Sequence, residues 1–523
     1  MDRREVLLGL TGAYGASALA PPPSTANPIQ APILANCGAA DLPAGATPTN
    51  CCPPLKTSDI VDFVPPPPWS PLRLRPAAHL ITDDKNYLEK FKLAISRMKA
   101  LPDSDPRSFK NQANVHCAYC NGAYDQVGFP DLELQVHESW LFFPWHRCYL
   151  YFFERILGKL IDDESFAIPF WNWDHPDGMK MPSIYTDPSS SLFDPLRDAK
   201  HQPPTLIDLD YNYVDPTYTE KEQIDHNLRI MYRQLVSNAG TPELFLGRPY
   251  RAGDKPNPGA GSLENIPHSP VHAWTGDRNQ PNGENMGNFY SAGRDPIFYA
   301  LHANVDRMWD VWKAINKKKH KDFTDKDWLD TSFLFYDENK RPVRVRVRDA
   351  LDPSVMKYKY DEVPLLWLNK KPLVKLGRLT KEARGRKLEE HVEANVAASF
   401  PLKLKKAVSV TVKRPKVSRS DAEKRGRRSR DEYVKIDVYV NSAGDEEKVS
   451  PGGREMIGSF VSVPHKHKHD KKEKAITTSL RLGLSEFLEE TGAEGDESVV
   501  VSLVPRKGKS KIKIGGLRIE FAS

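Results

Sequence analysis

The sequence predicts a mainly α-helical core, a helix bundle with long loops, followed by a C-terminal antiparallel β-sandwich domain. Apolar residues recur at helical spacing in WHRCYLYFFERILGKLI at 145–161. They alternate with polar residues in YVKIDVYVN at 433–441 and ESVVVSLVP at 497–505, which is the pattern of strands. At 523 residues the chain is long enough for two or three domains.

Composition and charge argue against two classes of partner. The formal net charge is only +6, and no apolar run reaches the roughly 18 residues that a membrane helix needs. We therefore expect no membrane span and no nucleic-acid partner. The basic stretch 413–430 lacks interleaved aromatic residues, and HKHKHD at 465–470 is flanked by lysine, so both are predicted to be solvated loops.

Residues 1–30 are expected to be a targeting signal and tether outside the fold. Arg3 and Arg4 precede a short apolar stretch that ends in the small residues at 18–20. This order is typical of a twin-arginine export signal, with a short ordinary helix as the alternative. We expect the twin-arginine-type import machinery as a partner.

A first group of histidines precedes and enters the 145–161 helix. His116 lies in ANVHCAYCNGAY, and His137 and His146 lie in QVHESWLFFPWHRCYLYFFE. Pro144 in the first turn loses no helical hydrogen bond, so His146 is predicted to lie just inside a rigid helix. A second helix is predicted at 226–236, after a loop-like region rich in Pro, Asp and Ser.

A second group of histidines lies between 264 and 309. His268 and His272 are four residues apart, which places two imidazoles on one helical face. His302 opens another helical run, and Asp306 follows four residues later, where a carboxylate could orient that imidazole. Isolated core or surface histidines are the alternative, but this combination favours a metal site.

Six imidazoles in two groups suit copper, zinc, iron or nickel, and ligand type does not choose between them. The two stretches resemble the paired copper motifs of type 3 copper proteins, above all the plant polyphenol oxidases known as catechol oxidases and tyrosinases. Further matching motifs are Cys120 four residues after His116, WNWDHPDGM at 171–179, HSPVHAWTG at 268–276 and the DWL triplet at 327–329. The resemblance covers nearly the whole chain.

The resemblance implies the site, the cofactors and the domain plan. Two copper ions are expected on His116, His137, His146, His268, His272 and His302. The expected parts are a dicopper catalytic domain at 31–325, a DWL segment closing the core at 326–369, a charged linker at 370–397 and a shielding β-domain at 398–523. It further implies disulfides Cys37–Cys52 and Cys51–Cys117, and a thioether bond between Cys120 and His137. Cys148, in an apolar helix, is expected to be a buried inert thiol.

The resemblance also implies roles for two further residues, which match functional positions of the family. Glu264 matches a carboxylate that holds a water in the family's site and helps deprotonate a phenol. Phe289 matches an aromatic gate over one copper. The alternatives are an ordinary helix-flanking acid and a core aromatic residue.

The implied activity is copper-dependent oxidation of ortho-diphenols to ortho-quinones, with O2 reduced to water. Monophenol hydroxylation stays open, because Ser269 after His268 does not decide it. The family also implies a location in the chloroplast thylakoid lumen and a latent proenzyme that a protease activates at the linker. The alternatives are a haemocyanin-like oxygen carrier, a specific phenol hydroxylase of secondary metabolism and a zinc hydrolase.

Overall fold

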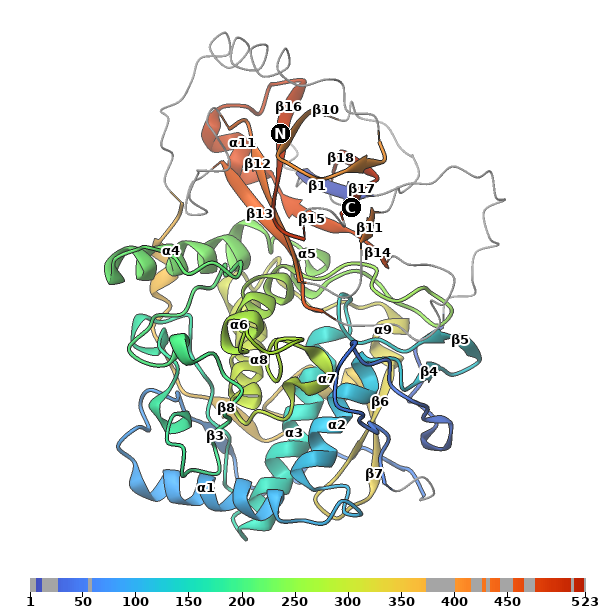
Figure 1. Ribbon diagram of the computed structural model, residues 1–523. Coiled ribbons are helices and arrows are strands. Elements are labelled where there is room, and N and C mark those ends of the chain that lie inside the picture. The colour runs from blue at the N-terminus through green and yellow to red at the C-terminus, as the bar shows by residue number, and fades with distance from the viewer. Residues whose placement is uncertain are drawn as a thin grey trace.

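The predicted fold class is confirmed by a computed structural model, in which a helical core carries antiparallel sheets at one end (Figure 1). The structure describes residues 6–11, 27–54, 59–372, 400–414, 426–428, 433–442, 455–464, 476–508 and 512–521. Most of the predicted linker and of the basic stretch, and all of HKHKHD, lie outside the described residues.

The core is built from helices joined by long loops. The helices are α1 (Lys85–Lys99), α2 (Phe109–Cys120), α3 (Phe142–Leu160), α4 (Glu220–Tyr232), α5 (Pro242–Leu246), α6 (Ser269–Thr275), α7 (Phe289–Ala292), α8 (Ile297–Ile315) and α9 (Lys326–Asp330). Shorter turns are η1 (Leu34–Asn36), η2 (Pro176–Gly178), η3 (Ser183–Tyr185), η4 (Ala199–His201), η5 (Arg233–Ser237), η6 (Glu264–His268), η7 (Val347–Ala350) and η8 (Leu366–Asn369).

Local sequence explains where the helices begin. Ser108 caps α2 by accepting a hydrogen bond from Asn111 N, and Thr219 starts α4 with a capping box to Glu222. Pro144, which was predicted to lie in the first turn of a helix, is the third residue of α3. The helix therefore starts two residues earlier, at Phe142. The predicted 226–236 helix lies within α4 and the turn η5 that follows it.

The segment after α8 closes the core with small sheets. The first five residues of the alternating run PVRVRVRD form β7 (Pro342–Arg346), and the last three enter η7. β7 pairs antiparallel with β6 (Ser332–Tyr336) and parallel with β2 (Val61–Asp62). β8 (Tyr358–Tyr360) pairs parallel with β3 (Arg73–Arg75), and β4 (Asp125–Gln126) pairs with β5 (Phe129–Glu133). These pairings join the start of the core to its end.

A buried ion network fixes this closing segment to the central helices. Asp306 on α8 accepts hydrogen bonds from Arg147 Nε at 2.5 Å, Arg75 Nη1 at 3.2 Å and Tyr358 OH at 2.7 Å. Glu154 on α3 also binds Arg75, at 2.8 Å. The charged side chains of this network are almost completely buried, so each charge depends on its partners.

The C-terminal part contains the predicted strands in antiparallel sheets. Strand orders are β10-β16-β12-β13, β15-β1-β18 and β14-β11-β17-β9. The strands are β9 (Leu402–Lys403), β10 (Val408–Lys413), β11 (Gly426–Arg428), β12 (Val434–Val440), β13 (Met456–Ser462), β14 (Ile476–Thr478), β15 (Leu480–Gly483), β16 (Ser498–Lys507), β17 (Lys513–Ile514) and β18 (Gly516–Phe521), with one helix, α11 (Ser485–Thr491). A second apolar cluster, which includes Val438, Val501 and Leu503, forms their core.

The N-terminal segment departs from the prediction. β1 (Val6–Thr11) lies between β15 and β18 and pairs antiparallel with both, with Leu8 opposite Leu482 and Ile519. The expectation that all of residues 1–30 lie outside the fold is therefore wrong for this strand, and it is also wrong for Ile29, which is buried in the main core. The apolar run VLLGLT fits a strand that has a hydrogen-bonded neighbour on each side. Its pairing covers the edges of β15 and β18 that face it.

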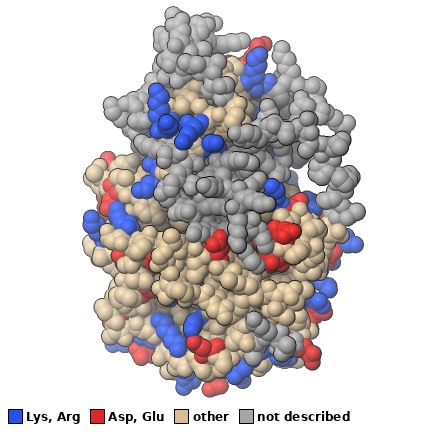
Figure 2. Space-filling view, turned by 45° about the vertical axis from the view of Figure 1, so that its right-hand side comes forward, with Lys and Arg blue, Asp and Glu red and all other residues tan. Residues whose placement is uncertain are grey.

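Charged side chains of both signs are mixed on the surface. Lys and Arg are interspersed with Asp and Glu over the core on the face that Figure 2 shows. In the part of the chain that the structure describes, no helix is both long and apolar enough to cross a membrane.

We expect Asp306→Ala to destabilise the core by about 3–5 kcal/mol, because Arg75 and Arg147 stay buried while each loses one of its two carboxylate partners. Urea unfolding followed by tryptophan fluorescence measures the loss. The control is Asp62→Ala, which removes an exposed pair with Arg344 and should barely move the midpoint. Equal midpoints for wild type and Asp306→Ala would contradict the role of the network.

Candidate metal centre

The six predicted histidines come from five parts of the core and meet in its interior. α2 carries His116, the loop before α3 carries His137, and α3 carries His146. The junction of η6 and α6 supplies the HxxxH pair, and α8 supplies His302. Each of the six side chains is at most 1% exposed.

Five of the imidazoles are oriented by backbone carbonyl groups, which accept the Nδ1 hydrogen. The pairs are His116 with Phe289 O at 2.8 Å, His146 with Phe142 O at 2.8 Å, His268 with Glu264 O at 3.0 Å, His272 with Met286 O at 2.8 Å and His302 with Phe298 O at 2.9 Å. The sixth, His137, has Nδ1 3.3 Å from Gln135 Oε1. An Nδ1–H that donates leaves the Nε2 lone pair for another partner.

The imidazole rings pack as two neighbouring trios. Ring centroids lie 5.1–5.8 Å apart in the first trio (His116, His137, His146) and 4.6–5.2 Å apart in the second (His268, His272, His302). The trios meet where His146 and His302 stack at 4.5 Å. Nε2 of His116, His146 and His272 is buried without a hydrogen-bond partner, which is costly unless a metal ion binds there.

Burial also sets the charge of the imidazoles. Loss of solvation lowers the pKa of His116 to about 3 and that of His272 to about 4. The pKa values of His146, His268 and His302 lie well below the ordinary range for the same reason, with a further contribution from neighbouring histidines. These rings are therefore neutral near pH 7, which is the form that binds a metal ion.

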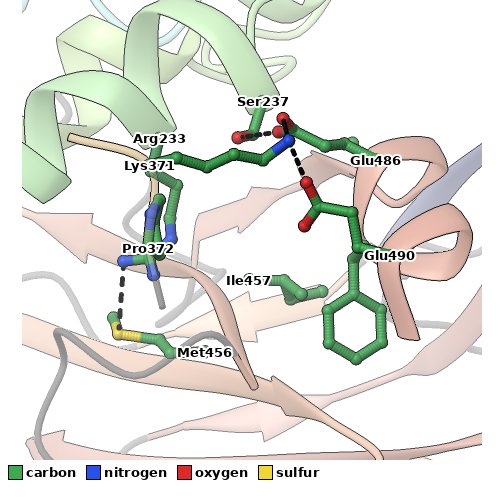
Figure 3. Close-up of a pocket in the computed structure, with 10 residues that line it drawn as sticks. Arg233, Ser237, Lys371, Pro372, Met456, Ile457, Glu486 and Glu490 are labelled. Carbon is green, nitrogen blue, oxygen red and sulfur yellow. Dashed lines mark hydrogen bonds and ion pairs between the residues drawn. The ribbon is translucent and has the colours of Figure 1, made fainter. Parts of the chain in front are cut away.

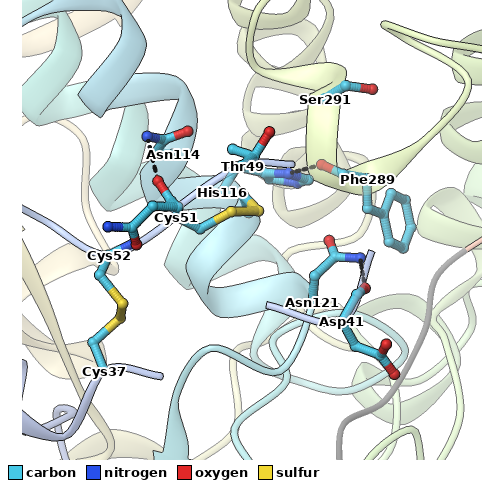
Figure 4. The surroundings of a disulfide bond; sticks show 12 residues. Cys37, Asp41, Thr49, Cys51, Cys52, Asn114, His116, Asn121, Phe289 and Ser291 are labelled. Carbon is cyan, nitrogen blue, oxygen red and sulfur yellow. Dashed lines mark hydrogen bonds between the residues drawn. A yellow bond between two sulfur atoms is a disulfide. The ribbon is translucent and has the colours of Figure 1, made fainter. Parts of the chain in front are cut away.

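Two disulfides fasten the N-terminal segment beside the first trio (Figure 4). Cys37–Cys52 closes a short loop, and Cys51–Cys117 joins that loop to the residue after His116 on α2. Both disulfides have the partners that the family resemblance implies. They limit how far α2, which carries His116, can move relative to the N-terminal segment.

Cys120 is a buried free thiol in the structure, as is Cys148. Its Sγ and one ring nitrogen each of His116 and His137 lie within 4.8 Å of one another. Burial raises the pKa of the Cys120 thiol well above its usual range, so it is a poor thiolate ligand. Because Cys120 lies close to His137, a thioether bond between them is possible in this geometry, and we keep it as a proposal.

Phe289 and Glu264 both lie at the junction of the trios. The Phe289 ring stacks on His137 with centroids 4.1 Å apart, while its carbonyl group orients His116. Glu264 Oε1 accepts a hydrogen bond from Glu138 N at 2.5 Å. Burial raises the pKa of the Glu264 carboxyl group well above 4.5.

One expectation about His302 is wrong. Asp306 does not orient this imidazole, because its carboxylate binds Arg75, Arg147 and Tyr358 instead. A carboxylate four residues along a helix can turn toward either neighbouring surface, and here the buried arginines attract it. The backbone carbonyl one turn earlier orients His302 instead.

Other residues of the site were not predicted. Phe298 packs against His302 with centroids 4.0 Å apart, and Phe142 packs against His268 at 4.7 Å. Gln135 contacts the His137 imidazole. Only their nearness to the histidines in sequence could have suggested them, since aromatic residues at helical spacing are ordinary core residues.

Comparison with protein families identifies the class of this site. The common central domain of tyrosinase matches residues 106–315, which contain all six histidines. The polyphenol oxidase middle domain matches residues 322–373, and the chloroplastic polyphenol oxidase C-terminal domain matches residues 400–521. The fold and the histidine trios are thus those of a tyrosinase-type protein.

Individual relatives narrow the class. The chain is 55% identical to a chloroplastic polyphenol oxidase of Malus domestica over 100% of its own length and 90% of the relative's, and 46% identical to chloroplastic catechol oxidase B of Solanum tuberosum over 100% and 89%. Among solved structures, latent apple tyrosinase superposes with a TM-score of 0.81 at 53% identity, covering 89% of this chain and 100% of that one. Latent aurone synthase superposes at 0.84 with 41% identity, covering 95% and 99%. The chain belongs to the polyphenol oxidase family.

If Cys120 and His137 are covalently joined, denatured, reduced and alkylated protein digested with endoproteinase Glu-C, which cuts after Glu133 between the two residues, should contain their two peptides linked. Mass spectrometry reads the link directly. Cys148 is the internal control, because this free thiol should be alkylated once the protein is denatured. Recovery of alkylated Cys120 from mature copper-loaded protein would rule the thioether out.

Proposed function

We propose that this protein catalyses the copper-dependent oxidation of ortho-diphenols to ortho-quinones, with O2 reduced to water. One observation carries the proposal: the imidazole rings of six buried histidines pack together as two neighbouring trios, in a chain with a tyrosinase central domain. The comparisons do not favour an oxygen carrier or a zinc hydrolase.

The donor set fits two copper ions. The first trio would hold one ion and the second trio the other, because neutral imidazole nitrogen supports both Cu(I) and Cu(II). When bound, the copper pair supplies the redox chemistry, accepting electrons from the diphenol and delivering them to dioxygen. Two diphenols release four electrons and four protons in all, which reduce one O2 to two waters.

The protein's own groups bind and orient the reactants. The Phe289 ring, stacked on His137, offers an apolar face on which an aromatic substrate can pack. Burial of Glu264 makes its carboxylate a stronger base than an exposed glutamate, so it suits removal of a phenolic proton. The surrounding aromatic shell excludes bulk water from the imidazoles.

The location and the range of substrates follow the relatives. Those from Malus and Solanum are named chloroplastic. We infer import to the thylakoid lumen, supported by the pair Arg3 and Arg4 before an apolar stretch. A relative from Larrea tridentata, 51% identical, is named a larreatricin hydroxylase, which keeps specific phenol hydroxylation as a second candidate.

Replacing His302 with alanine should lower the copper content from two ions to one per chain and reduce quinone formation from catechol to background. Atomic absorption and absorbance of the quinone measure the two effects. The control is His320→Phe, because His320 lies outside both trios and stacks on Trp312. Full turnover with unchanged copper in His302→Ala would show that this residue is not a ligand.

We further propose that the intact chain is a latent form in which the C-terminal domain covers the metal core. β13 is an edge strand of its sheet, and core asparagine side chains bind its backbone. Asn265, next to Glu264, donates to Ser459 O and accepts from Val461 N at 2.8 Å. Asn238 donates to Ile457 O at 2.9 Å, so alternate residues of β13 are held against the core.

Further contacts support the docking. Val461 and Val463 belong to the same apolar cluster as the aromatic residues around the histidines. Lys435 on β12 is completely buried and binds Asp210 of the core at 2.8 Å. A tethered domain needs only a modest interface to stay bound, because its effective concentration is high.

The start of the linker is fastened on both sides, and Figure 3 shows the contact of Lys371 with Glu486 and Glu490. Lys370 binds Asp225 on α4 at 2.7 Å, whereas Lys371 binds Glu486 on α11 at 2.6 Å and also contacts Glu490. The neighbouring lysines therefore connect the core and the C-terminal domain where the linker leaves. We propose that an activating protease cuts beyond this point, before about residue 393.

Asn238→Ala should activate the intact chain without touching the metal ligands. The substitution removes two hydrogen bonds between the core and the C-terminal domain, one from Asn238 to Ile457 O and one from Gly483 N to Asn238. Their loss should weaken docking of the domain by about 1–3 kcal/mol, or roughly tenfold in the docking equilibrium. Catechol oxidation should rise several-fold, as it should after limited proteolysis of the linker. Asn279→Ala, an exposed site bonded only to nearby Asp277, should change nothing. If the cleaved core is no more active at matched copper content, the domain is structural.

A further inference from the structure

A third cluster of metal-binding side chains lies outside the two trios. His79 follows β3, and His175 and Asp177 lie at the start of η2. One ligand atom from each lies within 4.8 Å of the other two. The last two belong to the WNWDHPDGM segment, which the proposed oxidation chemistry does not use. Two imidazoles and a carboxylate are a donor set that zinc and copper accept.

The His79 ring is oriented in the same way as the imidazoles of the trios. Its Nδ1 lies 2.8 Å from Asn172 Oδ1, so Nδ1–H donates and Nε2 keeps its lone pair. Asn172 is completely buried, which fixes the acceptor. A partly buried imidazole with a fixed tautomer loses little freedom when it binds an ion.

His175 and Asp177 offer a second and a third donor at a suitable separation. His175 Nδ1 lies 3.6 Å from Asp177 Oδ2. An ion that bound both atoms tetrahedrally at about 2.1 Å would hold them about 3.4 Å apart. The competing hydrogen bond from Asp177 N to His175 Nδ1 is long, at 3.3 Å. The Asp177 side chain is 71% exposed, so it can turn toward an ion at little cost.

The rings of His79 and His175 are neighbours, and a turn of one ring would bring a nitrogen of each onto one ion, because an imidazole lone pair lies in the ring plane. Their centroids lie 6.0 Å apart with the planes inclined by only 14°. Desolvation lowers the pKa of His175, so the ring is neutral near pH 7 in spite of the carboxylates beside it.

We propose that His79, His175 and Asp177 form a separate mononuclear site for a divalent transition-metal ion, either Cu²⁺ or Zn²⁺, with water completing its coordination. Copper binds such donors more tightly than zinc in the usual order of affinities. The site is partly exposed, so ions reach it from solvent without passing through the core.

The backbone around this site is already fixed without an ion. Ala78 N donates to Phe170 O at 2.9 Å, which joins the segment of His79 to the strand-like residues before His175. Asp174 is held by Asn304 and Arg307 of α8, at 3.0 and 3.1 Å. An ion would therefore bind a preformed site and stabilise the folded chain by mass action, and the fold does not depend on it.

Electron paramagnetic resonance separates this site from the dinuclear centre. Two closely bridged Cu²⁺ ions pair their spins and give no signal, whereas an isolated Cu²⁺ ion has one unpaired electron. Copper-loaded full-length protein would be titrated with Cu²⁺ in a background in which His465, His467 and His469 are replaced by alanine. This background is needed because those residues of HKHKHD could also bind copper.

We expect one visible Cu²⁺ ion per chain, with hyperfine splitting from two nitrogens. His79→Ala and Asp177→Asn should each weaken its binding at least about tenfold. Asp187→Asn, at another exposed aspartate, should leave the affinity unchanged. Zn²⁺ alone should raise the melting temperature of the background protein and not that of His79→Ala, a readout that does not depend on the dinuclear centre. Absence of a visible ion, or equal affinity in the background and both cluster variants, would overturn the proposal.

Discussion

The hydrogen bond between a histidine Nδ1 and a carbonyl oxygen is the interaction on which the site depends. An imidazole buried at the centre of a helical core must be neutral and must have a fixed tautomer before it can bind a metal ion. Five carbonyl groups impose that tautomer, and they come from η6, α3, α7, α8 and the loop before α7. The positions of these backbone segments therefore decide where the Nε2 atoms point.

The rest of the core keeps these segments in place. The Asp306 network and the parallel pairing of β3 with β8 hold α3 and α8, which contribute His146 and His302. The disulfides hold α2, and Phe289 both orients one ligand and covers another. Since each buried polar group without a partner costs about 1–3 kcal/mol, a site with several open Nε2 atoms needs such a stable surrounding structure.

Sequence predicted the parts of this arrangement that depend on local pattern. Helical periodicity gave α3 and α8, alternation gave β7, β12 and β16, and the HxxxH spacing gave two ligands of one trio. Contacts between segments that are distant in the sequence could not be predicted from local pattern. The carbonyl partner of His116 lies 173 residues away in the sequence. β1, near the N-terminus, completes a sheet of C-terminal strands. Asp306 binds arginines whose nearness cannot be read from their spacing in the sequence. The asparagine contacts to β13 are likewise a product of docking.

The central claim is that imidazole nitrogen alone binds both metal ions, and X-ray absorption at the copper edge of loaded full-length protein tests it most directly. The claim predicts two copper ions per chain, imidazole scattering from about three rings at each, and a copper–copper contribution. Cys120 is the competing donor, because its sulfur lies as close to His116 and His137 as a ligand would. A sulfur scatterer at one copper, or a single ion without a copper neighbour, would contradict the account.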